Sequence, residues 1–223
     1  MFFIQYLGQD PLAYLIALFV LAFGIVLHNV FQALLANAFG DPSAKQRGFT
    51  STSNPTLHLD SFSWIWLAIF GFAVPTSIPV RLHNRQYSKE AAVWLAGPVS
   101  MLLWAFVLML LAGFVTQLVG NDDSFRSVIL GMMLGAFNSV SLAAIFIFPI
   151  PPLDGARALF AVGNKQIKNF ISTLEQWMSR TPFGFMLIFL VLSFTGLLGA
   201  VRSPIISGML SAIQSLGLPV PGI

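Results

Sequence analysis

A long apolar run near the start of the chain places the strongest limit on what it can fold into. Residues 12–39 include no Asp, Glu, Lys or Arg, and as a helix rising 1.5 Å per residue they would extend roughly 40 Å. A bilayer has a hydrocarbon core of about 30 Å, which a helix of this length crosses with some tilt. The run is too long for a cleaved signal peptide and lacks its basic start. The sequence therefore predicts a transmembrane helix here.

The overall composition agrees with a membrane protein. Hydrophobic residues make up 57% of the chain and charged residues 9%, against about 25% charged in an ordinary soluble domain. The formal charge of +3 arises in the connections between apolar runs, which favours a membrane location and gives no reason to expect a nucleic-acid partner. The chain has no cysteine, which excludes disulfides, cysteine-ligated zinc, iron–sulfur clusters and thiol catalysis.

Further apolar runs predict an all-α polytopic membrane protein with five to six transmembrane helices, folded as a single integral membrane domain over residues 1–223. The expected spans are residues 12–39, 91–119, 128–148 and 183–201, a short segment at 62–73, and a final segment at 204–218 that either crosses or lies in the interface. Pro75 and Pro79 favour extended backbone after the short segment. Residues 74–80 are therefore expected to form a short membrane-embedded strand or a re-entrant segment.

The distribution of basic residues gives an orientation if residues 62–73 cross the membrane. Loop parity then places seven Lys and Arg residues on one side and four on the other, and the positive-inside rule puts the N-terminus in the cytoplasm. This assignment fails if the short segment is re-entrant. The larger group is Arg81, Arg85, Lys89, Arg157, Lys165, Lys168 and Arg180, and the smaller is Lys45, Arg47, Arg126 and Arg202.

Polar side chains inside apolar runs are the candidate functional residues, because they are costly there. His28 and Gln32 are four residues apart in the first span, so they share one helical face with Asn29 beside them. Asp154 follows the prolines that end the fourth span. Irregular backbone at membrane depth must be enclosed by protein or line a water-filled cavity, so Asp154 is expected to face inward.

Five stretches of the chain, in order, resemble the site-2 proteases, the intramembrane zinc metalloproteases whose first helix contains H-E-x-x-H. The resemblance covers most of the chain and implies that family's fold. Besides the first helix, the matching family patterns are G-D-P-T-A-K, N-P-x-x-H-x-D, A-G-P and F-N-L-L-P-I-P-P-L-D-G. They correspond here to residues 40–45, 54–60, 96–98 and 145–155, the last ending in Pro149-Ile150-Pro151-Pro152-Leu153-Asp154-Gly155.

The chain departs from this family where the chemistry would occur. His28-Asn29-Val30-Phe31-Gln32 replaces H-E-x-x-H, so His28 and Asp154 remain as the credible metal ligands where catalytic zinc uses three. Asn29 stands at the position of the general base, and an amide cannot exchange a proton with metal-bound water. Two amides of the family pattern fall on Met101 and Phe146, and Asn138 lies about two turns before the second of these.

These departures predict a catalytically inactive site-2-protease-like protein that binds or scaffolds transmembrane segments, either alone or within a larger membrane complex. We expect an integral protein of a bacterial-type cytoplasmic membrane with no cofactor. The alternative is an intramembrane zinc metalloprotease, with zinc held by His28, Gln32 and Asp154; a transporter would need more charged residues in its spans. The predicted partner-binding groove contains Met101, Phe146, Pro149 and Pro151.

Structural roles for the same residues stay open. His28 is also expected as a buried histidine hydrogen-bonded to a neighbour, with Asn29 and Gln32 as interhelical hydrogen-bond partners that reach Asp154. Asp154 either caps the following helix, pairs with Arg157 or ligates a metal. We expect structural roles for His58 and Asp60. Residues 74–80 are either an ordinary loop or an edge that accepts an extended client segment.

Overall fold

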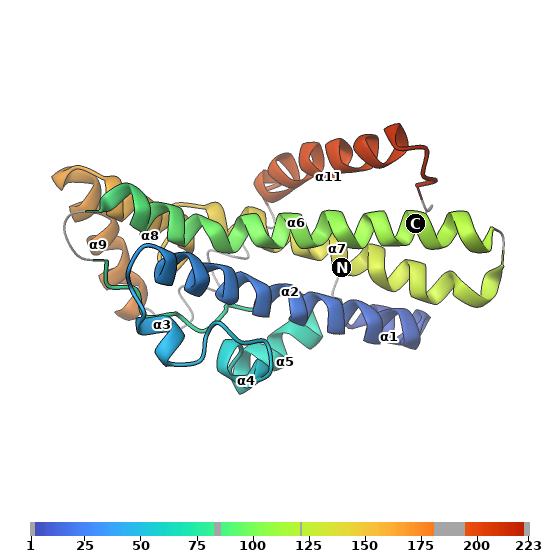
Figure 1. The fold of residues 1–223 in the computed structure, drawn as a ribbon, viewed down its shortest axis with the longest axis horizontal. Coiled ribbons are helices and arrows are strands. Elements are labelled where there is room, and N and C mark those ends of the chain that lie inside the picture. Colours follow the sequence, from blue (N-terminus) through green and yellow to red (C-terminus); the bar gives the residue numbers. More distant parts are fainter. Residues whose placement is uncertain (1–2, 83–85, 121, 181–194, 221–223) are drawn as a thin grey trace.

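The protein is described here from a computed structural model, which covers all residues except 1–2, 83–85, 121, 181–194 and 221–223. The described part is all-helical, as the sequence predicts (Figure 1). Residues 74–80 form no strand, so the strand considered for them is wrong and the re-entrant alternative remains. The elements in chain order are α1 (Gln5–Gln9), α2 (Pro11–Ala38), α3 (Ser43–Gln46), α4 (Pro55–His58), α5 (Ser61–Phe70), α6 (Tyr87–Val119), a 3₁₀ turn η1 (Asp123–Phe125), α7 (Arg126–Ile147), α8 (Asp154–Val162), α9 (Lys165–Arg180) and α11 (Leu197–Ser215).

Four helices of the described part are long and apolar enough to cross a membrane: α2, α6, α7 together with η1, and α11. The first three confirm the expected spans at residues 12–39, 91–119 and 128–148. The last contains most of the predicted segment at residues 204–218 and is by length and composition a span. Most of the span predicted at residues 183–201 lies outside the described residues.

Close contacts between glycines and neighbouring helices bring α2, α6 and α7 together into one bundle. A Cβ atom added at Gly135 on α7 would lie 2.2 Å from a methyl group of Val20, and one at Gly131 would lie 2.7 Å from Cβ of Ile16. Trp104 of α6 donates its indole N–H to the carbonyl of Val20 in α2 at 2.8 Å. Small residues allow helix backbones to approach in membranes, where packing rather than water drives association. These three helices position the polar residues described below.

The segment between α2 and α6 enters the bundle and returns. The hydroxyl of Tyr14, near the start of α2, donates to the carbonyl of Ala68 in α5, and the side chain of Asn29, further along α2, donates to the carbonyl of Thr76. The side chain of Asp41, beyond the end of α2, accepts a hydrogen bond from the backbone N–H of Arg81. The chain thus descends along α2 in α5, turns at Gly71 with φ of 67°, and rises again in extended form. We call residues 61–80 the re-entrant limb.

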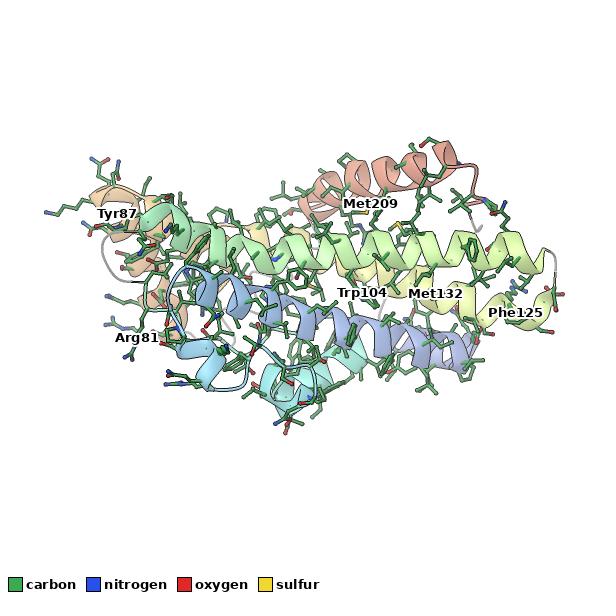
Figure 2. All side chains as sticks on the ribbon, viewed as in Figure 1. Arg81, Tyr87, Trp104, Phe125, Met132 and Met209 are labelled. Carbon is green, nitrogen blue, oxygen red and sulfur yellow. The ribbon has the colours of Figure 1, made fainter. Side chains whose placement is uncertain are left out.

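This limb overturns the loop-parity orientation. Arg47 and Arg81 line one cavity at the same end of the bundle, so the chain between them does not cross. Figure 2 shows Arg81 and Tyr87 at that end and Phe125 at the other. The prediction of a cytoplasmic N-terminus assumed that residues 62–73 cross the membrane. Because they do not, that assumption is wrong and the prediction loses its basis. α5 has only ten residues, about 15 Å of helix, which is half a bilayer core.

The turn between α7 and α8 places Asp154. Proline disrupts helix geometry, so α7 ends before Pro149, and the backbone N–H of Leu153 donates to Ile150 in a tight turn. Gly155 is required here, because an added Cβ would lie 1.9 Å from the carbonyl oxygen of Ile147, a backbone atom with little freedom to move. The turn directs Asp154, the first residue of α8, back toward the middle of α2.

Candidate functional site

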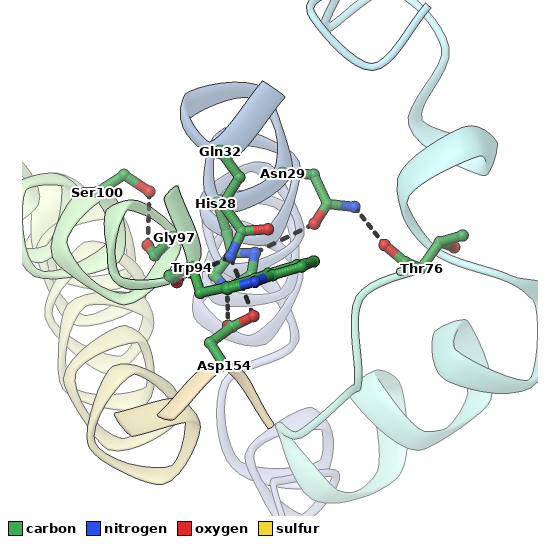
Figure 3. A network of polar contacts seen from close by, with 8 residues as sticks. All are labelled: His28, Asn29, Gln32, Thr76, Trp94, Gly97, Ser100 and Asp154. Atoms are coloured by element: carbon green, nitrogen blue, oxygen red, sulfur yellow. Dashed lines mark hydrogen bonds and ion pairs between the residues drawn. The ribbon is translucent and has the colours of Figure 1, made fainter. Parts of the chain in front are cut away.

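The structure brings four predicted polar residues together in one buried centre between α2 and α8 (Figure 3). His28, Asn29 and Gln32 of α2 and Asp154 of α8 are each at most 6% exposed. We call these four residues the polar centre. Gly97 of α6 covers it from one side, and a Cβ there would lie 2.3 Å from Nε2 of His28 and 2.6 Å from Nε2 of Gln32. The A-G-P stretch therefore includes the glycine that lets α6 lie directly against these side chains.

His28 makes a hydrogen bond through each ring nitrogen. Its Nδ1 lies 3.1 Å from Oδ1 of Asn29, and its Nε2 lies 2.6 Å from Oδ2 of Asp154. The amide nitrogen of Asn29 donates to the carbonyl of Thr76 at 2.9 Å, so the oxygen of that amide faces His28. Nδ1 must then carry a hydrogen to donate.

Gln32 also donates into the centre. Its amide nitrogen donates to Oδ1 of Asp154 and to the backbone carbonyl of Trp94, both at 3.0 Å. Both N–H groups of the amide are used, and the nitrogen rather than the oxygen faces the carboxylate. Of the open expectations for Asp154, pairing with Arg157 and capping of α8 do not occur, because both carboxylate oxygens bond to α2. The expected bridge from Asn29 to Asp154 is also wrong: that amide bonds to His28 and Thr76.

A cavity of about 110 Å³ adjoins the polar centre. Phe146 lines it and packs edge-on against the ring of His28, with ring centroids 5.1 Å apart. The extended part of the re-entrant limb forms the opposite wall. Besides the four residues of the centre and Phe146, the lining consists of Val74, Pro75, Thr76, Ser77, Pro152, Leu153 and Arg157.

The donor set of the polar centre does not fit a catalytic zinc ion. Two ligands bound tetrahedrally at about 2.0–2.1 Å from zinc lie about 3.3 Å apart, whereas Nε2 of His28 and Oδ2 of Asp154 are 2.6 Å apart. Gln32 presents an N–H group, which cannot bind a cation. No cluster of three His, Cys, Asp or Glu residues that could hold a metal ion is found among the described residues.

The four residues of the predicted groove lie in different environments. Met101 is fully buried in the core that surrounds the polar centre, and Phe146, 1% exposed, lines the small cavity. Pro149 is exposed at the end of α7, and Pro151 lines a larger cavity beside α8. Asn138 bonds to its own helix at Leu134. Partner contact by the groove residues stays a prediction.

Two aspartates of the family-like motifs stabilise the local backbone by accepting hydrogen bonds from it. The side chain of Asp41 accepts hydrogen bonds from the backbone of Ser43 and of Arg81. Asp60 caps α5 by accepting from the backbone N–H of Ser63 at 2.6 Å.

His58 closes the turn that leads into α5. Its ring lies 2.9 Å from the carbonyl of Ser51, and its own carbonyl accepts from the backbone of Thr76. The structural roles expected for His58 and Asp60 agree with these contacts.

Sequence reasoning did not identify two groups of contacts at the site. The carbonyls of Thr76 and Trp94 complete the polar centre, and no side-chain pattern marks a backbone acceptor. The guanidinium of Arg157 stacks on Trp94, 4.6 Å from the ring centroid. That stacking joins α8 to α6, and the three-residue spacing from Asp154 suggested only an ion pair.

One comparison with known proteins extends over nearly the whole chain. The sequence is 31% identical over 229 aligned residues to a Bacillus subtilis (strain 168) protein named "Putative zinc metalloprotease YwhC". The alignment covers 95% of this chain and 94% of that protein, and so includes both α2 and α8. No protein-family model matches the chain, and no solved structure is significantly similar to it.

Proposed function

Since the chain belongs to the site-2-protease-like family of the Bacillus zinc metalloprotease relative, we propose that it is a member without proteolytic activity that binds or scaffolds transmembrane partners. One observation carries the proposal. The groups of the polar centre bond to one another and to backbone carbonyls, with Nε2 of His28 2.6 Å from Asp154. Such a centre stabilises the junction of α2, α6, α8 and the re-entrant limb without needing a metal.

The absence of a general base at Asn29 supports the same proposal. Its amide nitrogen donates to Thr76 and its oxygen accepts from His28, so both ends are committed to structural contacts. General acid–base catalysis typically contributes about 10²–10⁴ to a rate. The glutamates of the chain are Glu90 and Glu175, and both line a separate cavity at the end of the bundle.

The re-entrant limb offers a surface to a transmembrane partner. An apolar cavity of about 480 Å³ lies between α5 and the extended residues of the limb, with Phe62, Trp66 and Phe72 in its walls. Phe62 is 60% exposed. Of the four predicted groove residues, Pro149 at the end of α7 is exposed and can meet a partner, whereas Met101, Phe146 and Pro151 are buried. The positive-inside rule would place the end that contains Arg81 in the cytoplasm of a bacterial-type membrane.

The alternative function is zinc-dependent cleavage of transmembrane peptides. The name of the Bacillus relative favours it, because 31% identity over the full length is compatible with a shared activity. This alternative needs Gln32 to turn its oxygen toward a zinc ion and His28 to give up its proton to solvent. Metal content separates the two proposals.

The first test measures zinc in the purified full-length protein by mass spectrometry. We expect far less than one zinc per chain in the wild type, no change of melting temperature with EDTA, and zinc binding by Gln32→His, which supplies a second imidazole one turn from His28. Stoichiometric zinc in the wild type, together with cleavage of a transmembrane reporter that His28→Ala abolishes, would establish the protease and refute our proposal.

The second test examines the partner surface in intact membranes. A photoreactive residue at Pro149 is compared with one at Leu118, which is 70% exposed on α6 far from the groove. We expect a discrete protein adduct from position 149 and only lipid adducts from position 118. Equal adducts from both positions, or none from either, would argue against a scaffolding role.

A further inference from the structure

A second cavity, of about 460 Å³, lies where α6, α8 and α9 meet the extended residues 77–81. Its charged lining consists of three arginines and two glutamates: Arg47, Arg81, Arg157, Glu90 and Glu175. We call it the arginine cavity. Counted over these side chains, it has one excess positive charge, which is the complement of a single carboxylate.

Arg157 is the innermost of these groups and has donors to spare. Its side chain is half-buried against the ring of Trp94. Its guanidinium makes no hydrogen bond and no close ion pair within the described part of the chain, although the carboxylates of Asp154 and Glu175 lie near enough to attract it. Asp154, one turn earlier on the same helix, has both oxygens occupied by His28 and Gln32. A guanidinium with five N–H donors is suited to grip a carboxylate with two parallel hydrogen bonds.

The arginine cavity is a neighbour of the small cavity beside the polar centre. Ser77, Pro152 and Arg157 line both this cavity and the small one beside His28. One wall along this path is extended backbone that leads from Val74 to Arg81. A polypeptide in extended form can follow such a wall, whereas a lipid headgroup would use the guanidinium alone. The shape therefore favours a peptide ligand.

We propose that the arginine cavity binds one carboxylate of a peptide, either an acidic side chain or a C-terminal carboxylate, on the segment that flanks the partner's transmembrane helix. This inference rests on the proposed function, because it specifies the chemistry of the partner. Arg157 makes the principal contact, and Arg47 and Arg81 at the exposed rim attract the charge.

The test uses the full-length protein in phosphatidylcholine nanodiscs and four fluorescent alanine-rich pentapeptides. One has a central Asp and an amidated end, one a central Asn and a free C-terminus, one both carboxylates, and one neither. Anisotropy gives the dissociation constants. Because hydrogen bonds between a guanidinium and a carboxylate are among the stronger ones, at least one single-carboxylate peptide should bind about tenfold more tightly than the neutral one, a difference of about 1.4 kcal/mol. The tighter of the two identifies the source of the carboxylate.

Two variants assign this preference to the cavity. Arg157→Gln should reduce the tenfold ratio of dissociation constants to about one. Arg157→Lys keeps the charge but loses the paired N–H donors of the guanidinium, so it should leave an intermediate ratio. Arg180→Gln removes an equal charge from the exposed end of α9 and should leave the ratio unchanged. Equal binding of all four peptides by the wild type, or equal loss in Arg157→Gln and Arg180→Gln, would overturn the inference.

Anionic lipid is the competing occupant. If native mass spectrometry detects phosphatidylglycerol retained by the wild type and not by Arg157→Gln, and if that lipid abolishes peptide binding, the cavity is a lipid site and our inference is wrong. Failure of the peptide preference while the adduct from position 149 persists would refute only this inference. Stoichiometric zinc with reporter cleavage would refute the proposed function instead.

Discussion

The polar centre and the glycine contacts around it differ in how they relate to the family pattern. At the contacts, Gly97 and Gly155 occupy the positions that the family motifs give to glycine, and each lies where a Cβ would collide with its neighbours. In the centre, Asn29 and Gln32 replace the residues that a zinc hydrolase requires. The residues that set the distances between helices thus match the family motifs, whereas two residues of the centre do not.

The polar centre therefore contributes to the packing of the helices, as the glycine contacts do. Asp154 is hydrogen-bonded to His28 and to Gln32, which lie 126 and 122 positions earlier in the sequence. These hydrogen bonds lie at a depth where water is scarce. Unpaired polar groups are costly there. The donors and acceptors of the centre thus match one another. Three of the four predictions below test how far centre and contacts differ.

The largest effect is expected from Gly155→Ala. The new Cβ would meet the backbone carbonyl of Ile147 at 1.9 Å, so α7 and α8 must separate, which costs about 3 kcal/mol or prevents folding. The measurement is unfolding by SDS in mixed micelles. Gly208→Ala on α11, where nothing lies within 4 Å of the added Cβ, is the matched control and should be neutral or slightly stabilising. Equal destabilisation by both variants would contradict the contact.

Asp154→Ala should have the next largest effect. It leaves His28 and Gln32 without their acceptor in a buried site, and loss of a charged hydrogen-bond partner costs about 2 kcal/mol. The same unfolding assay on Asp154→Ala, His28→Leu and the double variant gives the coupling energy. We expect the double variant to be more stable than the sum of the single changes predicts. Additive effects would mean that the two residues do not interact.

Gly97→Ala should destabilise by a smaller amount, about 1.5 kcal/mol. The atoms that its Cβ meets are side-chain ends of His28 and Gln32 rather than backbone, so they can turn away at the expense of hydrogen bonds to Asp154. In a His28→Ala background the same change should cost clearly less. An undiminished cost in that background would show that the collision lies elsewhere in α6.

The smallest effect concerns Asp10, outside both regions at the start of α2. Hydrogen bonds from the backbone of Ala13 and the hydroxyl of Ser127 lower the pKa of this carboxyl below its usual value. Its stabilisation is therefore complete above the unfolded pKa of about 3.9 and is lost as the pH falls through the lower folded pKa.

An N-cap contributes about 1 kcal/mol, so the melting temperature in detergent should fall modestly between pH 6 and pH 3. Asp10→Asn keeps an acceptor that does not titrate, and it should remove this part of the pH dependence. An identical pH profile for both proteins would count against the cap.

Hydrophobicity alone predicted α2, α6 and α7, because uncharged runs of bilayer length have few other stable forms. It could not decide the path of residues 62–73. Whether a short apolar segment crosses or returns depends on acceptors such as Ala68 and on Asn29, which lie far away in sequence. For the same reason the loop-parity orientation was wrong.

The sequence predicted which residues form the candidate site but not which hydrogen bonds they make. Helical spacing placed His28 and Gln32 on one face, and the prolines before Asp154 indicated that it faces inward. The direction of each amide follows from the carbonyls of Thr76 and Trp94, which only the folded chain brings near. Arg157 stacks on Trp94 and makes no close ion pair with Asp154, whose two oxygens bond to His28 and Gln32.

The hydrogen bond from Asn29 to Thr76 limits which side chains position 29 can accept. A glutamate there has no N–H group for that carbonyl and would bring an anionic oxygen close to it. The re-entrant limb would then lose this hydrogen bond to α2. Placing a carboxylate beside His28 is therefore expected to weaken the attachment of the limb to the bundle.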